Sequence, residues 1–71
     1  MDFEITNEYI ELIKLLKIKS LVSSGGEAKM VVDEGLVTVN GETEWRKRAK
    51  LRPGDVVVFN GNTITITQLA T

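Results

Sequence analysis

The sequence predicts a small α+β domain in which two short helices precede four strands. Apolar residues recur at helical spacing over the first half of the chain. Residues 63–67 alternate strictly between threonine and isoleucine, as a half-buried strand does. Two Asn-Gly pairs, at 40–41 and 60–61, are typical of hairpin turns. Because the chain has 71 residues, we expect residues 1–71 to form a single domain.

The first helix is predicted to begin at Thr6, a residue type that caps helix N-termini. Ile5 and Ile10 have the spacing of a hydrophobic staple around that cap. Four apolar or aromatic residues follow the spacing of one helix face and are interpreted as core: Tyr9, Leu12, Ile13 and Leu16.

The second helix is predicted to begin at Ser24, with Glu27 reaching back to complete a capping box. Its apolar face holds Ala28, Val31 and Val32. Gly35 is placed where a helix ends in the left-handed conformation. We therefore expect a short helix between these two signals.

The second half of the chain is predicted to form strands. Residues 36–39 and 42–45 flank the first Asn-Gly turn, and residues 56–59 and 63–67 flank the second. Between the two hairpins, Pro53 and Gly54 occupy the two central positions of a type II turn. The predicted element order is ααββ followed by ββ.

The composition excludes several chemistries. The chain contains no cysteine and no histidine, so it offers no disulfide, thiol nucleophile, imidazole ligand or Ser-His triad. We expect no catalytic residue, no metal and no cofactor. No apolar run approaches the roughly 20 residues of a membrane span, and the acidic start is unlike a signal peptide. We expect a cytoplasmic protein that does not bind membranes.

Positive charge is concentrated in residues 46–52. The net charge of the chain is only −1, yet this run holds five of its nine basic residues and no acid. The run is either a solvated loop or an anion site, and we favour the anion site because clustered cations repel one another. Phosphate is the expected anion, since an arginine can bind it with two parallel hydrogen bonds. The five basic residues are Arg46, Lys47, Arg48, Lys50 and Arg52.

Other residues are weaker candidates for an anion or nucleic-acid site. Lys29 lies on the second helix and, taken alone, is best interpreted as a surface lysine. Ser24 and Gly25 begin that helix, where unpaired N–H groups attract anions. Trp45 either stacks on a base or fills the core, and core packing is the favoured interpretation. Three lysines near the end of the first helix could border the same site: Lys14, Lys17 and Lys19.

Taken together, these motifs resemble the S4 RNA-binding domain. The resemblance rests on Ser24-Gly25-Gly26-Glu27-Ala28-Lys29, on Gly35 to Gly41 and on Leu51 to Asp55, and it covers roughly residues 8–66. The sequence around Ser24 and Trp45 is similar to that of small stand-alone bacterial S4 proteins of the YbcJ/YaaA-like group. The resemblance implies the αL-motif fold, with two helices packed on a small, mostly antiparallel sheet of about four strands.

The resemblance also implies a non-catalytic protein that binds structured RNA, with ribosomal RNA or a ribosome precursor as the target class. Ribosome or ribosome-assembly proteins are possible further partners, and we expect a monomer. The implied RNA-binding residues are Ser24, Gly25, Lys29, Arg46, Lys47, Arg48 and Lys50. Many S4 domains open the first helix with Arg-Leu-Asp, but Glu11-Leu12-Ile13 stands here. The RNA footprint is therefore expected to be smaller, or shifted toward residues 46–52.

A different class of function stays open from the sequence. The chain could be a protein-interaction module that pairs with a partner through residues 56–59 or 63–67 by strand addition. It could also be an adaptor that delivers RNA to a separate enzyme.

Overall fold

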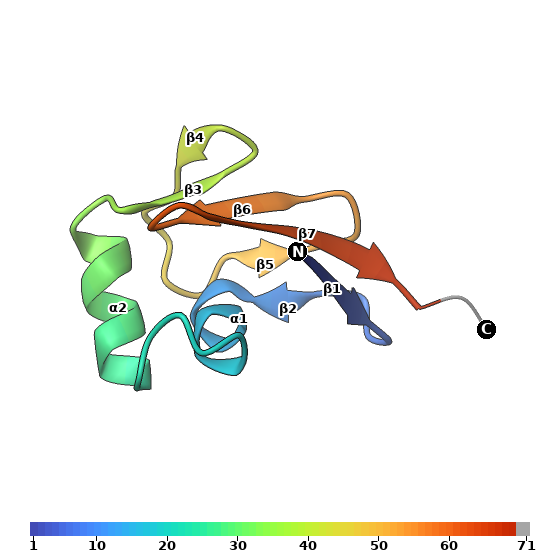
Figure 1. Ribbon diagram of the computed structural model, residues 1–71, viewed down its shortest axis with the longest axis horizontal. Helices are drawn as coiled ribbons and strands as arrows, with labels where there is room; N and C mark the ends of the chain where they lie inside the picture. The colour runs from blue at the N-terminus through green and yellow to red at the C-terminus, as the bar shows by residue number, and fades with distance from the viewer. Residues whose placement is uncertain (70–71) are drawn as a thin grey trace.

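The computed structural model describes residues 1–69 (Figure 1). Two helices, α1 (Leu12–Ile18) and α2 (Gly25–Asp33), lie on the same side of a five-stranded sheet. The sheet has the strand order β1-β7-β6-β3-β4, and two further strands, β2 and β5, form a separate antiparallel pair. The strands are β1 (Asp2–Ile5), β2 (Ile10–Glu11), β3 (Val37–Val39), β4 (Glu42–Thr43), β5 (Lys50–Leu51), β6 (Val56–Phe59) and β7 (Asn62–Gln68).

The sheet is mostly antiparallel, as expected, and both Asn-Gly turns form. Asn40 and Gly41 have φ angles of 53° and 84°, and Asn60 and Gly61 have φ angles of 51° and 79°. These left-handed values are those of a type I′ turn, which suits the twist of the strands it joins. The first turn joins β3 to β4 and the second joins β6 to β7. Gly54 has a φ of 98°, as the third position of a type II turn requires.

The second helix is confirmed. Ser24 caps α2, and its hydroxyl accepts a hydrogen bond of 3.1 Å from the Glu27 amide. The helix face predicted to be apolar is buried. Gly35 follows the helix with a φ of 72°, in the left-handed region that favours glycine.

The prediction for the beginning of the chain is wrong. Thr6 does not cap a helix, because residues 2–5 form β1, which pairs in parallel with β7. Ile10 and Glu11 then pair with β5, and α1 begins only at Leu12. The sheet therefore has five strands, with a separate pair, in place of about four. Parallel pairing joins residues more than 60 positions apart, so no local pattern announces it.

The edges of the sheet bear on the alternative of strand addition. Both β6 and β7 are interior strands with a neighbour on each side, so neither offers a free edge to a partner strand. The two edges of the main sheet are β1 and the short β4. The alternative left open above, strand addition at residues 56–59 or 63–67, is therefore not available in this fold.

The core lies between the sheet and the helices. Leu12, Leu15 and Leu16 of α1 are completely buried, as are Ile64 and Ile66 of β7. The alternation predicted for residues 63–67 is confirmed, since the two isoleucines face the core. Within the described residues, no helix combines the length and the apolar character that crossing a membrane demands.

Candidate nucleic-acid interface

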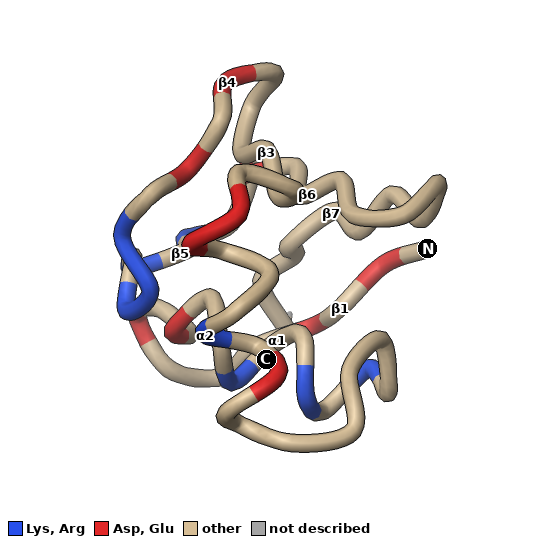
Figure 2. The backbone as a smooth tube through the Cα atoms, turned by 90° about the vertical axis from the view of Figure 1, so that its left-hand side faces the viewer, with Lys and Arg blue, Asp and Glu red and all other residues tan. Residues whose placement is uncertain are grey.

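Residues 44–49 connect β4 to β5 and hold three of the predicted cations. We call this segment the basic loop; it appears in Figure 2 as a blue run bordered by red. Its backbone is fixed to α1, because the Leu12 amide donates to the Ala49 carbonyl at 2.9 Å and the Ile13 amide donates to the Lys47 carbonyl at 3.2 Å. Ala49 is buried in the core. The loop is thus seated on the N-terminal end of α1.

Each of the three cations of the basic loop contacts an acid from elsewhere in the chain or from the start of the loop. Arg46 Nε lies 3.1 Å from Glu44, Lys47 Nζ lies 3.0 Å from Asp33, and Arg48 Nε lies 3.0 Å from Glu11, measured to carboxylate oxygens. The absence of acids within residues 46–52 therefore does not leave these three charges unbalanced. The pairing also gives Glu11 a role: it stands where many S4 domains have a cation, and here it forms an ion pair with Arg48.

These ion pairs are open to solvent on the side of the cation. The side chains of Arg46 and Arg48 are 79% and 76% exposed. Water screens pairs of this kind, so they contribute little to stability. A phosphate could therefore bind the open side of Arg46 or Arg48 while the paired carboxylate stays in place. The hydrogen bonds from Arg46 hold the pKa of the Glu44 carboxyl below its ordinary value, and the hydrogen bond to Glu44 raises the pKa of Arg46.

Lys29 lies on the same side of α2 as the basic loop. Asp33, which pairs with Lys47, comes four residues after Lys29, so the two side chains are neighbours on one helix face. Four residues of helix, about 6 Å along the axis, separate them. Lys29 is exposed and, within residues 1–69, forms no ion pair. Lys29 thus lies about one helical turn from the carboxylate that Lys47 contacts.

Ser24 and Gly25 lie away from the basic loop. They begin α2, whereas Asp33 ends it, and a helix of this length spans about 13 Å. The carboxylate of Glu27 already occupies this helix start, where it accepts hydrogen bonds from the Ser23 amide at 2.5 Å and the Ser23 hydroxyl at 3.0 Å. These bonds lower the pKa of Glu27, the amide having the larger effect. Ser24 and Gly25 are therefore not part of one compact cluster with the basic loop.

Lys17 is the lysine of α1 that approaches the start of α2. It lines a shallow hollow together with residues 20–23 and Glu27. Lys19 instead lies over the ring of Phe3, 5.9 Å from the ring centroid. Lys14 lines a different hollow, on the side of β1 and β2. The three lysines near the first helix thus belong to different surroundings rather than to one site.

Lys50 and Arg52 gather around Tyr9. The Lys50 ammonium lies 5.1 Å from the centroid of the Tyr9 ring, and the Arg52 guanidinium lies 6.0 Å from it. These distances suit cation–π attraction. Tyr9 is predicted above to be a core residue, but it is only half-buried. No sequence pattern indicates this cluster, because it depends on the pairing of β2 with β5.

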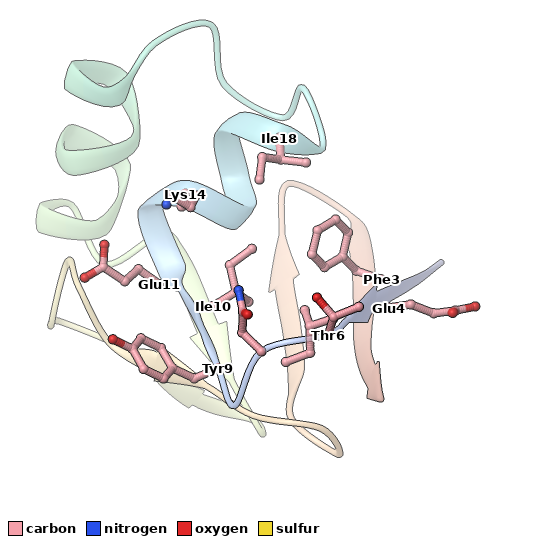
Figure 3. A pocket seen from close by; sticks show the side chains of 10 residues that line it. Phe3, Glu4, Thr6, Tyr9, Ile10, Glu11, Lys14 and Ile18 are labelled. Carbon is pink, nitrogen blue, oxygen red and sulfur yellow. The ribbon is translucent and has the colours of Figure 1, made fainter. Parts of the chain in front are cut away.

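A hollow of about 570 Å³ lies between the β1–β2 segment and α1. Figure 3 shows Lys14 and Glu11 at one side of it, with Phe3 and Ile18 at the other. None of the seven predicted RNA-binding residues lines it. Arg46 and Lys50 line a second hollow, but with Glu42, Glu44 and Asp55, so carboxylates outnumber cations there.

Trp45 does not fill the core, contrary to the favoured interpretation. Its side chain lies on the surface and the residue is 62% exposed. The returning strand β4 ends at Thr43, so Trp45 falls in the basic loop rather than in the sheet. The far end of its indole ring lies against Gly35.

Comparisons with known proteins agree on one family. A family model described as the S4 domain matches residues 3–67. YbcJ of Escherichia coli is 40% identical over 58 residues, which cover 82% of this chain and 83% of YbcJ. A protein of Bacillus subtilis named "Probable ribosome maturation protein RlbA" is 42% identical over 57 residues, covering 80% of each chain. The solution structure of E. coli YbcJ is described as revealing an αL motif involved in RNA binding. It matches this chain with a TM-score of 0.71 and 36% sequence identity, and the match covers 93% of this chain and 85% of YbcJ.

Proposed function

Because the chain belongs to the S4 domain family, we propose that it binds structured RNA and is not itself an enzyme. One observation carries this proposal. Lys29 lies on α2, and Lys47 of the basic loop contacts Asp33 on the same face of that helix, while the backbone of the loop is fixed to α1. Two further cations, Arg46 and Arg48, project from that loop and are largely exposed. Folded elements thus hold four cations on neighbouring parts of one surface.

The proposed mechanism is neutralisation of backbone phosphates. Phosphates approach Arg46 and Arg48 from the exposed side of each cation and share it with the paired carboxylate, and they compete with Asp33 for Lys47. Binding releases the counterions condensed on the RNA, so affinity falls as salt rises. Because side chains do not reach into the deep groove of an RNA helix, shape rather than base identity sets the preference for paired regions.

We place Lys29, Arg46, Lys47 and Arg48 at the centre of the RNA surface. Lys50 is a peripheral member, since it lies over Tyr9. Ser24 and Gly25 join only if the RNA extends along the whole of α2. The name of the Bacillus subtilis relative supports ribosomal RNA, or a ribosome precursor, as the target.

Fluorescence anisotropy tests the proposal. The purified chain is titrated into a structured rRNA fragment, a single strand and a DNA duplex, each at several salt concentrations. If about four phosphates are neutralised, the logarithm of the binding constant falls against the logarithm of salt concentration with a slope of about −3. We expect the folded RNA to be preferred. A slope near zero, or equal weak binding to all three nucleic acids, would overturn the proposal.

A further inference from the structure

We propose that Trp45 is a stacking platform for one unpaired nucleobase, while the cations beside it hold the phosphates of the same RNA segment. The inference rests on the proposed function and adds a feature of the RNA, namely a bulged or flipped nucleotide next to a helical stem. A scattered apolar residue on a surface is ordinary and has no meaning by itself. The argument therefore depends on how Trp45 is held.

Hydrogen bonds to the carboxylate of Glu44 fix the backbone on both sides of Trp45. Glu44 Oε2 accepts hydrogen bonds from the Arg46 amide at 3.0 Å and from Arg46 Nε at 3.1 Å, and Oε1 accepts one from Nη2 at 3.2 Å. The Glu44 amide in turn donates to the Val37 carbonyl at 2.9 Å. The side chain of Glu44 is only 14% exposed. Trp45 is thus the middle residue of a three-residue segment whose ends, Glu44 and Arg46, are joined by hydrogen bonds, and this segment is attached to β3.

The far end of the indole is also fixed. A Cβ atom at Gly35 would lie 2.7 Å from Cη2 of Trp45, closer than real atoms approach. Gly35 therefore provides both the left-handed turn after α2 and the space in which the ring rests. A tryptophan that is 62% exposed cannot have both ring faces covered. The ring is held at two ends, yet a face remains open to solvent.

The neighbouring charges indicate which ligand the open face suits. Arg46 and Lys47 follow Trp45 directly, and Lys47 lies at the end of α2. A nucleotide joins an aromatic base to an anionic phosphate, and an aromatic side chain beside cations matches both parts. An apolar protein partner would have to remove water from two cations to cover the same ring, which is unfavourable. Aromatic stacking is also a principal way in which proteins bind unpaired bases.

The test compares three RNA duplexes of equal length: one fully paired, one with a single bulged adenosine, and one with an abasic nucleotide at the bulge. Because Trp45 is the single tryptophan of the chain, its fluorescence reports on the ring directly. We expect the bulged adenosine to quench this fluorescence and to raise affinity about tenfold over the abasic duplex, the size that stacking of one base gives. The abasic and fully paired duplexes should bind without such quenching.

Two variants complete the test. Trp45→Leu should lose the preference for the bulged adenosine yet bind the paired duplex as the wild type does, and Trp45→Phe should keep part of the preference. If Trp45→Leu weakens all three duplexes equally, or if no RNA quenches the wild-type fluorescence, the stacking inference is wrong while RNA binding stands. If the wild type binds none of the duplexes, the proposed function itself fails. Quenching in the wild type decides the matter even if Trp45→Leu does not fold.

Discussion

Lys47 Nζ lies 3.0 Å from Asp33 Oδ1, and this contact ties the basic loop to the last residue of α2. It places a lysine of the loop one helical turn from Lys29. The same contact puts a carboxylate within the proposed RNA surface, where it opposes the approach of a phosphate. Asp33 is therefore both a positioning residue and a competitor.

Replacing Asp33 by asparagine should strengthen RNA binding. The change frees Lys47 and removes one negative charge within a Debye length of the phosphates, so we expect affinity to rise about two- to fivefold at moderate salt. Stability should change by less than about 0.5 kcal/mol, because the pair is exposed. Anisotropy titrations measure the first effect and urea unfolding the second. Glu34→Gln changes the charge equally without freeing Lys47, and an equal gain there would show that only net charge matters.

Replacing Arg46, Lys47 and Arg48 together by alanine should leave the fold intact and weaken RNA binding at least tenfold. The salt dependence should become shallower by about two to three units of slope, since up to three phosphate contacts are lost. Lys29→Glu should weaken binding by a similar factor. Circular dichroism checks the fold, and anisotropy at several salt concentrations checks the affinity. Unchanged affinity in both variants would mean that the surface has been placed wrongly.

Gly35→Ala should destabilise the protein for two separable reasons. The left-handed φ of 72° costs a residue with a Cβ about 1–2 kcal/mol. The new Cβ also meets the ring of Trp45 at 2.7 Å. A double-mutant cycle with Trp45→Ala, followed by urea unfolding, separates the two effects. We expect the penalty at position 35 to shrink when Trp45→Ala is also present, and an undiminished penalty would argue that the ring moves aside freely.

Acid should destabilise the protein partly through Glu27. Hydrogen bonds from Ser23 hold the pKa of this carboxyl in the folded state below its ordinary value of 4.5. The folded state therefore binds a proton less readily than the unfolded state. The contribution to stability is complete above the ordinary pKa of 4.5 and is lost as the pH falls through the folded pKa.

Urea unfolding at neutral pH and at several values below the ordinary pKa of 4.5 measures this loss. Glu27→Gln should lower stability at neutral pH and flatten the decline in acid. Glu8→Gln, at an exposed position in the β1–β2 segment, is the matched control and should preserve the decline. An identical decline in the wild type and in Glu27→Gln would exclude this carboxyl as a source.

The local features of the fold were predictable and the non-local ones were not. Ser24, Gly35 and the Asn-Gly turns are determined by caps and backbone conformations that a few adjacent residues specify. Thr6 has the chemistry of a cap, but residues 2–5 pair in parallel with β7, and this strand pairing prevails over the local preference. Tyr9, predicted to be a core residue, is only half-buried for the same reason, because the pairing of β2 with β5 brings Lys50 and Arg52 to its ring.

The candidate site divides in a similar way. The cationic character of residues 46–48 is visible in the sequence, and the family resemblance singled out Lys29. Their proximity depends on the contact between Lys47 and Asp33, which no sequence pattern indicates. The acids that pair with the loop cations come from α2, from β2 and from the first residue of the loop itself, so the charge count within residues 46–52 overstates the local imbalance.

The hydrogen bonds from the first two amides of α1 to the loop carbonyls have a thermodynamic consequence. The basic loop has already lost its backbone conformational entropy in the free protein, because its ends are bonded to a helix and to a strand. Association with a ligand then requires no coil-to-ordered transition in this segment. A flexible cationic tail of the same composition would lose that entropy on binding, and its affinity would be correspondingly lower. Folding itself thus fixes the backbone from which these charged side chains project.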